Sequence, residues 1–258
     1  LRFLKARKKD GFLNVISIFS FIGISLGVAV LIIVMSVMNG FRTELINKIV
    51  GFNSHVTVKP YSNSIDETKI NNKLKSISKN IIFSNSGEAI ILKNNNTKGI
   101  VLRGYKRNDL LNLEVLTNEK FNGELNQFDK NSISIGSELS FSLDLEIGDE
   151  LTLMSPSGVQ TIIGSMPKQK TFVVNSIFNS GLAEFDNNIA FIELDVLEEF
   201  FGYDPNERNL EIYLKNPNNI ESQKLIVKQV FDDEFVFSWA CLLYTSPSPR
   251  DQRGSRMA

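Results

Sequence analysis

One long apolar run near the N-terminus limits what this chain can fold into. No charged residue occurs between Gly11 and Phe41, and as a helix this run would be about 46 Å long at roughly 1.5 Å per residue. About 20 apolar residues suffice to cross a bilayer, and a helix is the single-segment structure that satisfies its own backbone amides in lipid. The run therefore predicts a transmembrane helix over residues 12–41.

Two other interpretations of the run fit less well. A cleaved signal peptide has an apolar region of about 7–15 residues followed by a small-residue cleavage site, whereas this run is longer and no A-x-A sequence follows it. A buried helix of a soluble domain rarely stays apolar on every face over so many turns. The membrane helix remains the favoured interpretation.

Charges beside the run predict its orientation. The segment before it is basic, with Arg2, Lys5, Arg7, Lys8 and Lys9. The segment after it mixes Arg42 and Lys48 with Glu44. Because basic residues collect on the cytoplasmic side, residues 1–11 are expected in the cytoplasm and the chain beyond Phe41 outside it.

Small residues share one face of the predicted helix. Ser20, Gly23 and Gly27 recur at helical spacing, and a glycine pair four residues apart lets two membrane helices approach closely. The alternative is that glycine is simply common in membrane helices. We favour a helix-packing face.

The composition suits a folded domain with a membrane helix. The 258 residues are 42% hydrophobic with a net charge of −1. The chain therefore has no excess of basic residues of the kind that favours binding to nucleic acid.

The last residues differ in composition from the rest of the chain. No lysine follows Lys228, and the end from Cys241, CLLYTSPSPRDQRGSRMA, resembles translated sequencing-adapter read-through. We expect residues 241–258 to be a foreign tail, the alternative being a genuine disordered tail, and the natural protein to continue past about Ala240.

Strand and helix patterns follow the same order at both ends of the region after the run. Near its start, alternation predicts a strand at 55–59, a capping box of Ser64 and Glu67 begins a helix through Ile77, and strands follow at 81–84, 88–92 and 99–103. Near its end, a strand is predicted at 210–214, a helix at 217–230 and a strand at 234–238. The simplest assembly is an α+β sandwich with helices on one side of an antiparallel sheet.

The middle section, residues 105–204, has its own pattern. Strands are predicted at 132–136, 150–154, 171–177 and 188–192, with one helix capped by Ser137 and ending at Leu143, and another capped by Asp195 and stopping at Gly202. The predicted division is a stalk at 42–53, a sandwich formed by 54–104 and 205–240, and an inserted, mostly β subdomain at 105–204.

A long loop lies between Met154 and Lys170. It contains prolines and glycines together with apolar residues, and loops of this length without regular structure are usually functional or disordered. Apolar residues in such a loop favour a partner surface.

Catalytic patterns are missing from the sequence. The single histidine, His55, cannot build a multi-histidine metal site, and the sequence has no G-x-x-x-x-G-K-[ST] loop and no G-x-G-x-x-G after a strand. The S-x-x-K sequences at Ser76 and Ser165 lack the accompanying motifs of serine acyl enzymes. We predict no catalytic residue, metal ligand or cofactor, and a protein that is not itself an enzyme.

Several motifs together resemble a transporter family. The most specific is S-V-M-N-G-F at residues 36–41, which ends the apolar run. Others are Ser54-His55-Val56, Ile135-Gly136-x-x-Leu139, Leu145-x-Ile147-Gly148-Asp149, Ser155-Pro156 with Met166-Pro167, and Ser180-Gly181-Leu182-x-Glu184-x-Asp186. On these residues the chain resembles the lipoprotein-releasing ABC transporter permeases, the LolC/LolE family of the MacB/FtsX-like class, over most of its length.

The resemblance implies a mechanical function. Family members have four membrane helices, with a periplasmic domain between the first two that consists of a porter part and an insertion. It also implies a location in the inner membrane of a Gram-negative bacterium. The implied partners are a separate LolD-like ATPase subunit, a second permease copy or paralogue, acylated lipoproteins and a LolA-like periplasmic carrier. Because the chain stops before the second helix, we expect it to be a fragment that does not transport alone.

Site residues follow from the resemblance and from position in the chain. A lipoprotein cleft is expected at Val34, Val37, Met38 and Phe41, near the outer end of the predicted helix; the alternative is that these side chains face bulk lipid. The family's carrier-docking hook corresponds to the long loop, with Pro156, Val159, Ile162, Ile163, Met166 and Pro167.

Two other functions remain open. One is a single-span, membrane-anchored periplasmic interaction protein. The other is a mechanotransmission permease of the MacB/FtsX type with another partner, such as an outer-membrane channel or an activator of cell-wall hydrolases.

Overall fold

The computed structural model describes residues 11–61, 64–93, 96–117, 121–156, 159–161, 164–216 and 220–239. The chain divides into two compact units, Leu1–Asn47 and Lys48–Ala258. Each unit is described by itself.

The first unit consists of helix α1, which spans Gly11–Phe52 and so continues into the second unit. Its segment Val15–Phe41 has a mean hydropathy of 2.8 and no buried residues, so it is long and apolar enough to cross a membrane by length and composition. The residues predicted as a stalk, up to Phe52, belong to the same helix. The apolar run therefore folds as predicted, as a helix with an exposed apolar surface.

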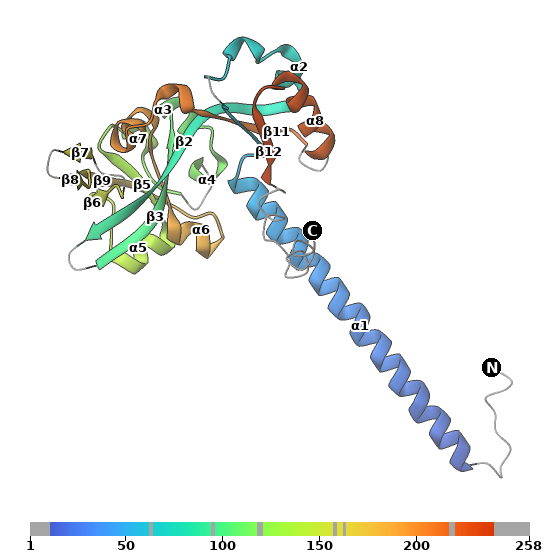
Figure 1. The fold of residues 1–258 in the computed structure, drawn as a ribbon. Helices are drawn as coiled ribbons and strands as arrows, with labels where there is room; N and C mark the ends of the chain where they lie inside the picture. The colour runs from blue at the N-terminus through green and yellow to red at the C-terminus, as the bar shows by residue number, and fades with distance from the viewer. Residues whose placement is uncertain are drawn as a thin grey trace, which may run out of the picture. The chain divides into compact units, whose positions relative to one another are not determined.

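The second unit is built on one mixed sheet, shown in Figure 1. Among the described residues, the order of its strands is β12-β1-β11-β2-β3-β10-β5-β9-β4, and β6 pairs with β2 and β9. The strands are β1 (Val56–Lys59), β2 (Ser78–Lys93), β3 (Asn96–Tyr105), β4 (Asn122–Gly123), β5 (Ser132–Gly136), β6 (Glu150–Met154), β9 (Gln169–Phe178), β10 (Ile189–Glu193), β11 (Asn209–Leu214) and β12 (Phe235–Ser238).

Short helices connect the strands. They are η1 (Glu67–Lys69), α2 (Asn72–Ile77), α3 (Arg107–Leu110), α4 (Glu114–Thr117), η2 (Leu125–Gln127), α5 (Ser137–Leu143), α6 (Ala183–Asn188), α7 (Leu194–Phe201), η3 (Pro205–Glu207) and α8 (Ile220–Val230). A separate hairpin is formed by β7 (Val159–Thr161) and β8 (Gly164–Met166).

One half of the sheet joins the two ends of the domain. Strands β12, β1, β11 and β2 are antiparallel to their neighbours. Leu74 of α2 and Val227 of α8 pack in one cluster with Val56 of β1 and Ile212 of β11. The predicted sandwich, with helices on one side of an antiparallel sheet, is confirmed for this half.

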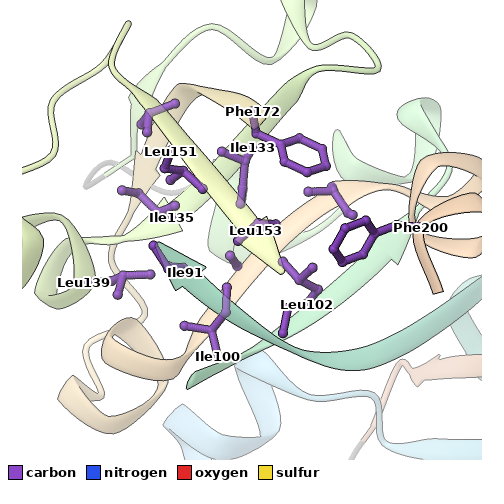
Figure 2. Packing of buried hydrophobic residues seen from close by; sticks show 14 of the residues in the cluster. Ile91, Ile100, Leu102, Ile133, Ile135, Leu139, Leu151, Leu153, Phe172 and Phe200 are labelled. Carbon is purple, nitrogen blue, oxygen red and sulfur yellow. The ribbon is translucent and has the colours of Figure 1, made fainter. Parts of the chain in front are cut away.

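The other half of the sheet contains parallel pairs, which the sequence did not predict. Strand β3 is parallel to β10, and β5 is parallel to β9. Figure 2 shows Ile91 of β2 and Leu102 of β3 in the same cluster as Ile133, Phe172 and Phe200. The long β2–β3 hairpin thus contributes to the core of the middle section.

The two strands predicted at 81–84 and 88–92 are one continuous strand, β2. Gly87 lies between the two predicted strands and inside the observed one. A Cβ at Gly87 would lie 2.6 Å from Cε2 of Phe201, so the glycine leaves room for an aromatic ring of α7 rather than ending the strand.

Several predicted helix caps are wrong. The capping box of Ser64 and Glu67 does not begin one continuous helix, because Asp66 caps η1 and Asn71 caps α2, each by accepting a backbone N–H bond. The residues at the N-cap positions of α5 and α7 are Gly136 and Glu193, and neither makes a side-chain cap bond. Ser137 and Asp195 lie one or two residues further into these helices. The predicted stop at Gly202 is confirmed, with a left-handed φ of 73°.

A close approach at Gly136 gives a test of the fold. A Cβ there would lie 2.0 Å from the backbone oxygen of Asp186, so Gly136→Ala is expected to lower the free energy of unfolding by about 1–3 kcal/mol through overpacking. Denaturant unfolding of the detergent-solubilised chain measures this loss. Gly99→Ala is the matched control, since no atom lies within 4 Å of its Cβ position; equal losses in both variants would contradict the packing.

Candidate functional site

The residues predicted to line a helix-packing face and a lipoprotein cleft are all exposed on α1. They are Ser20, Gly23, Gly27, Val34, Val37, Met38 and Phe41. Among the described residues, a Cβ placed at either glycine meets nothing within 4 Å beyond the neighbouring backbone of its own helix, and Met38 and Phe41 are 63% and 61% exposed. These side chains are available for contacts with lipid or with another chain.

The predicted docking loop is partly regular. Val159 pairs with Met166 and Thr161 with Gly164 in the β7–β8 hairpin, and Pro156 and Pro167 flank it as exposed residues. Ile162 and Ile163, between the paired residues, lie outside the described residues. The expectation of a loop without regular structure is therefore wrong for these residues, because β7 before Ile162 pairs with β8 after Ile163 as an antiparallel hairpin.

The domain contains an aromatic site that the sequence did not reveal, around the last turn of α1. Phe52 is 4% exposed. Its ring stacks on Phe185 of α6 with centroids 4.6 Å apart, and lies 6.1 Å from Phe191 of β10 and 6.4 Å from Phe178 of β9. Three successive elements, all far from Phe52 in the sequence, thus enclose the end of the helix.

The segment 180–186, one of the family-like motifs, forms a turn beside this cluster. Asp186 is 2% exposed, and its Oδ1 accepts a bond of 2.8 Å from the backbone N–H of Ser180. Gly181 has a φ of 78°, and its carbonyl accepts a 3.3 Å bond from Nζ of Lys48. The motif therefore shapes a turn that contacts α1 next to the phenylalanines.

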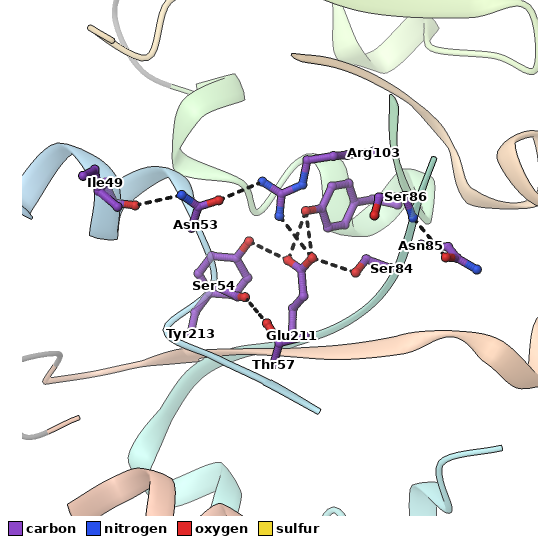
Figure 3. A network of polar contacts seen from close by, with 11 residues as sticks. Ile49, Asn53, Ser54, Thr57, Ser84, Asn85, Ser86, Arg103, Glu211 and Tyr213 are labelled. Atoms are coloured by element: carbon purple, nitrogen blue, oxygen red, sulfur yellow. Dashed lines mark hydrogen bonds and ion pairs between the residues drawn. The ribbon is translucent and has the colours of Figure 1, made fainter. Parts of the chain in front are cut away.

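A buried ion pair completes the site (Figure 3). Glu211 of β11 is 6% exposed, and its Oε1 lies 3.1 Å from Nη2 of Arg103 on β3. Three hydroxyls also donate to this carboxylate: Ser84 at 2.7 Å, Tyr105 at 3.0 Å and Tyr213 at 3.0 Å. A buried carboxylate with this many donors is well satisfied, as buried charges in proteins generally must be.

Arg103 extends the ion pair to the end of α1. Its Nη1 donates to Oδ1 of Asn53 at 3.5 Å, and its guanidinium lies 5.6 Å from the ring centre of Phe52 and 5.5 Å from that of Tyr105. The backbone N–H of Asn53 donates to the carbonyl of Ile49 within the helix end. Arg103 thus contacts the helix end through Phe52 and Asn53, and Tyr105 on its own strand β3. Through Glu211 it also contacts strand β11.

The two tyrosines and the arginine of this site keep their protons at physiological pH. Burial and the neighbouring carboxylate of Glu211 raise the pKa of Tyr105 and that of Tyr213, so both phenols remain donors. Burial alone would lower the pKa of Arg103, but the nearby tyrosines and Glu211 outweigh it and raise that pKa. The guanidinium stays charged at any physiological pH.

The beginning and the end of the domain lie side by side at this site. Val56 of β1 pairs with Ser238 of β12, and the backbone N–H of Trp239 donates to the carbonyl of His55 at 3.3 Å. Nδ1 of His55 accepts a bond of 2.7 Å from the backbone N–H of Leu214. The histidine therefore stabilises the local backbone, and among the described residues no group of three His, Cys, Asp or Glu is placed to hold a metal.

These features define a class: an apolar helix of membrane-spanning length whose last turn is built into an α/β domain. The chain belongs to the family of the MacB-like periplasmic core domain, whose family model matches residues 17–228. The predicted resemblance to the LolC/LolE proteins is confirmed by the relatives found.

Two relatives are named as transmembrane proteins of a lipoprotein-releasing system. LolC of Neisseria meningitidis is 27% identical over 93% of this chain and 59% of its own length. LolE of Haemophilus influenzae is 26% identical over 84% of this chain and 54% of its own length. The chain thus spans between half and three-fifths of these relatives. The periplasmic region of MacB from Actinobacillus actinomycetemcomitans aligns with a TM-score of 0.45 at 11% identity, covering 77% of this chain and 94% of that one.

The burial of Phe52 predicts a large effect of its removal. Phe52→Ala is expected to lower the free energy of unfolding by about 3–5 kcal/mol, as for other buried phenylalanines. Denaturant unfolding followed by circular dichroism measures it. Phe141→Ala removes the same side chain from a position that is 87% exposed and should stay within about 0.5 kcal/mol of the wild type. Similar losses at both positions would show that Phe52 is not buried.

Proposed function

We propose that this chain is part of the permease subunit of an ATP-driven complex that extracts lipoproteins from the inner membrane and passes them to a periplasmic carrier. The single observation that carries the proposal is a joint within the second unit: α1 ends at Phe52, which is enclosed by the domain's own aromatic residues. Such a joint suits a protein that converts helix movement into domain movement.

The energetics explain why an external source of free energy is needed. Each CH₂ of an acyl chain buried in lipid is worth about 0.8 kcal/mol, so a lipoprotein with several acyl chains is held firmly in the membrane. Hydrolysis in a separate LolD-like ATPase subunit would supply the work, and a LolA-like carrier would shield the released chains from water. This chain would then carry no catalytic residue and no cofactor of its own.

The orientation and the partners belong to the same proposal. The basic flank of the apolar run favours a cytoplasmic N-terminus, and the second unit would then lie in the periplasm of a Gram-negative bacterium. The complex would contain a second permease copy or paralogue. A MacB/FtsX-type permease acting on another partner could use the same joint and is the second candidate, supported by the match to the MacB-like periplasmic core domain.

Reconstitution tests the proposed function. The complete natural permease, its ATPase subunit and a fluorescent triacylated lipoprotein are placed in vesicles, and transfer to a soluble carrier is followed after ATP is added. ATP-dependent transfer is expected. If ATP is hydrolysed but lipoprotein stays in the vesicles while a different periplasmic partner is recruited, the second candidate replaces the first.

The proposed lipoprotein cleft makes a prediction in the same assay. Val37→Ser with Met38→Ser reduces apolar contact near the outer end of the membrane helix and should slow release severalfold, because methionine and valine suit varied acyl chains. Leu31→Ser is the control. Leu31 is equally exposed, at 64%, and lies closer to the N-terminal end of the helix than Val37 and Met38. Equal slowing by both would mean that these side chains face bulk lipid.

The β7–β8 hairpin is proposed to dock the carrier. Ile162→Asp with Ile163→Asp should abolish capture of the carrier in a pull-down, since charged side chains would replace apolar ones at the contact. Ile147→Asp changes another exposed isoleucine, 43% exposed in a turn outside the hairpin, and should leave capture intact. Unchanged capture by the double variant would rule out the hairpin as the docking site.

The face of Ser20, Gly23 and Gly27 is proposed to pack against another membrane helix. Gly23→Leu fills the space that close helix approach requires and should reduce the yield of assembled complex on size-exclusion chromatography. Leu26→Ala, on a neighbouring helical position, serves as the control. Normal assembly of the Gly23→Leu complex would contradict this packing.

A further inference from the structure

The ion pair of Arg103 and Glu211 is a poor candidate for a purely stabilising contact. Taking two charges out of water costs several kcal/mol each, so buried ion pairs are often no more stable than apolar residues of the same size. Arg103 and Glu211 have 12% and 8% of their side chains exposed. A function beyond stability would explain why both charges are placed inside the domain.

The position of the pair suggests what that function is. Strand β3 belongs to the core of the middle section, through Leu102, while β11 belongs to the sandwich core, through Leu210 and Ile212. Arg103 and Glu211 connect these two strands directly. Through Phe52 and Asn53, Arg103 also contacts the end of α1. One side chain therefore meets the helix end and both halves of the domain.

The contacts of Arg103 differ in strength. The bond to Glu211 is charge-assisted and 3.1 Å long, and such bonds are roughly twice as strong as neutral ones. The bond to Asn53 is neutral on one side and, at 3.5 Å, lies at the limit of hydrogen-bond length. Displacing the helix end would break the Asn53 contact first and leave the ion pair intact.

There is also room for such a displacement. A cavity of about 370 Å³ is lined by Asn53, Thr57, Arg103, Glu211 and Trp239, among other residues. Nε1 of Trp239 is buried and has no hydrogen-bond partner among the described residues. The segments that begin and end the domain thus border the same cavity, next to the weaker contact of Arg103.

We propose that Arg103 and Glu211 are positioning residues of transport: they form a fixed platform against which the Phe52 ring stays packed. Displacement of the α1 end passes through that ring to both halves of the domain, while the Asn53 contact breaks and re-forms. This inference rests on the proposed function. The pair takes part in no chemical step. It acts on the number of lipoproteins released per ATP hydrolysed.

A second ion pair in the same domain provides a matched control. Arg208 donates to Glu198 through Nε at 2.7 Å and through Nη2 at 2.6 Å, and Glu198 is 4% exposed. This pair links α7 to the segment before β11 and, among the described residues, forms no hydrogen bond or ion pair with α1. It has the same charges and similar burial without the position at the helix end.

The experiment compares two double variants in the complete complex. Arg103→Met with Glu211→Gln removes both charges and keeps an acceptor for the three hydroxyls. Arg208→Met with Glu198→Gln removes both charges of the control pair. The first variant should assemble and hydrolyse ATP, but the number of lipoproteins that it releases per ATP should fall by at least about 5-fold. Coupling free energies between sites typically correspond to about 5–150-fold effects. The control should keep the wild-type ratio. Equal ratios in all three complexes, or an equal fall in both variants, would overturn the proposal.

A milder variant covers the case in which the double variant fails to assemble. Asn53→Ala leaves the ion pair and the Phe52 contact intact and removes only the hydrogen bond from Arg103 to the helix end, so it should lower the same ratio. An unchanged ratio in that variant overturns the assignment.

A second readout separates this inference from the proposed function. Spin labels at Phe141 and Leu225, 87% and 61% exposed, report the distance between the two halves of the domain. ATP should shift this distance in the wild type and in the Arg208 variant but not in the Arg103 variant. A wild type that shows the shift without releasing lipoprotein would contradict the proposed function alone; a shift that persists in the Arg103 variant would contradict the platform.

Discussion

The burial of Phe52 is the contact on which the rest of this structure depends. Along the apolar segment Val15–Phe41 the helix buries nothing, yet within its last turn one side chain is almost fully removed from solvent. Burying a phenylalanine is worth roughly 1.5–3 kcal/mol, and the ring is held by phenylalanines from β9, α6 and β10. The same helix therefore belongs to an apolar surface at one end and to a protein core at the other.

Two kinds of contact hold that helix end, and they differ physically. The phenylalanine cluster is non-directional and supplies most of the stabilisation. The network of Arg103, Glu211 and three hydroxyls is directional, because hydrogen bonds and ion pairs fix angles as well as distances. A joint that combines both can hold the helix end firmly while defining how the two halves of the sheet lie against it.

Local patterns in the sequence predicted much of the fold. The apolar run, the strand at 132–136, the strand at 150–154 and the end of α7 at Gly202 are found as predicted. Errors arose where a residue has a tertiary reason to be present. Two strands were predicted at 81–84 and 88–92, whereas they are one strand in which Gly87 makes room for Phe201.

The candidate site was much harder to predict because its members are far apart in the chain. Glu211 alternates with Leu210 and Ile212 in a strand, a pattern that normally places the charged residue in water. Here the second face of that strand is also covered, by the aromatic cluster of Phe52 and its neighbours. No local signal pairs Glu211 with Arg103. The motif at residues 180–186 did mark part of the site, since its turn contacts Lys48.

The central claim is that the last turn of α1 is part of the folded domain. Hydrogen exchange of the backbone amides at residues 48–53 in the intact protein, read by mass spectrometry, tests it most directly. The structure predicts that these amides exchange as slowly as those of the buried strand β11, because opening them requires disruption of the domain core. Exchange as fast as that of a frayed helix end would contradict the joint, and with it the mechanical account built upon it.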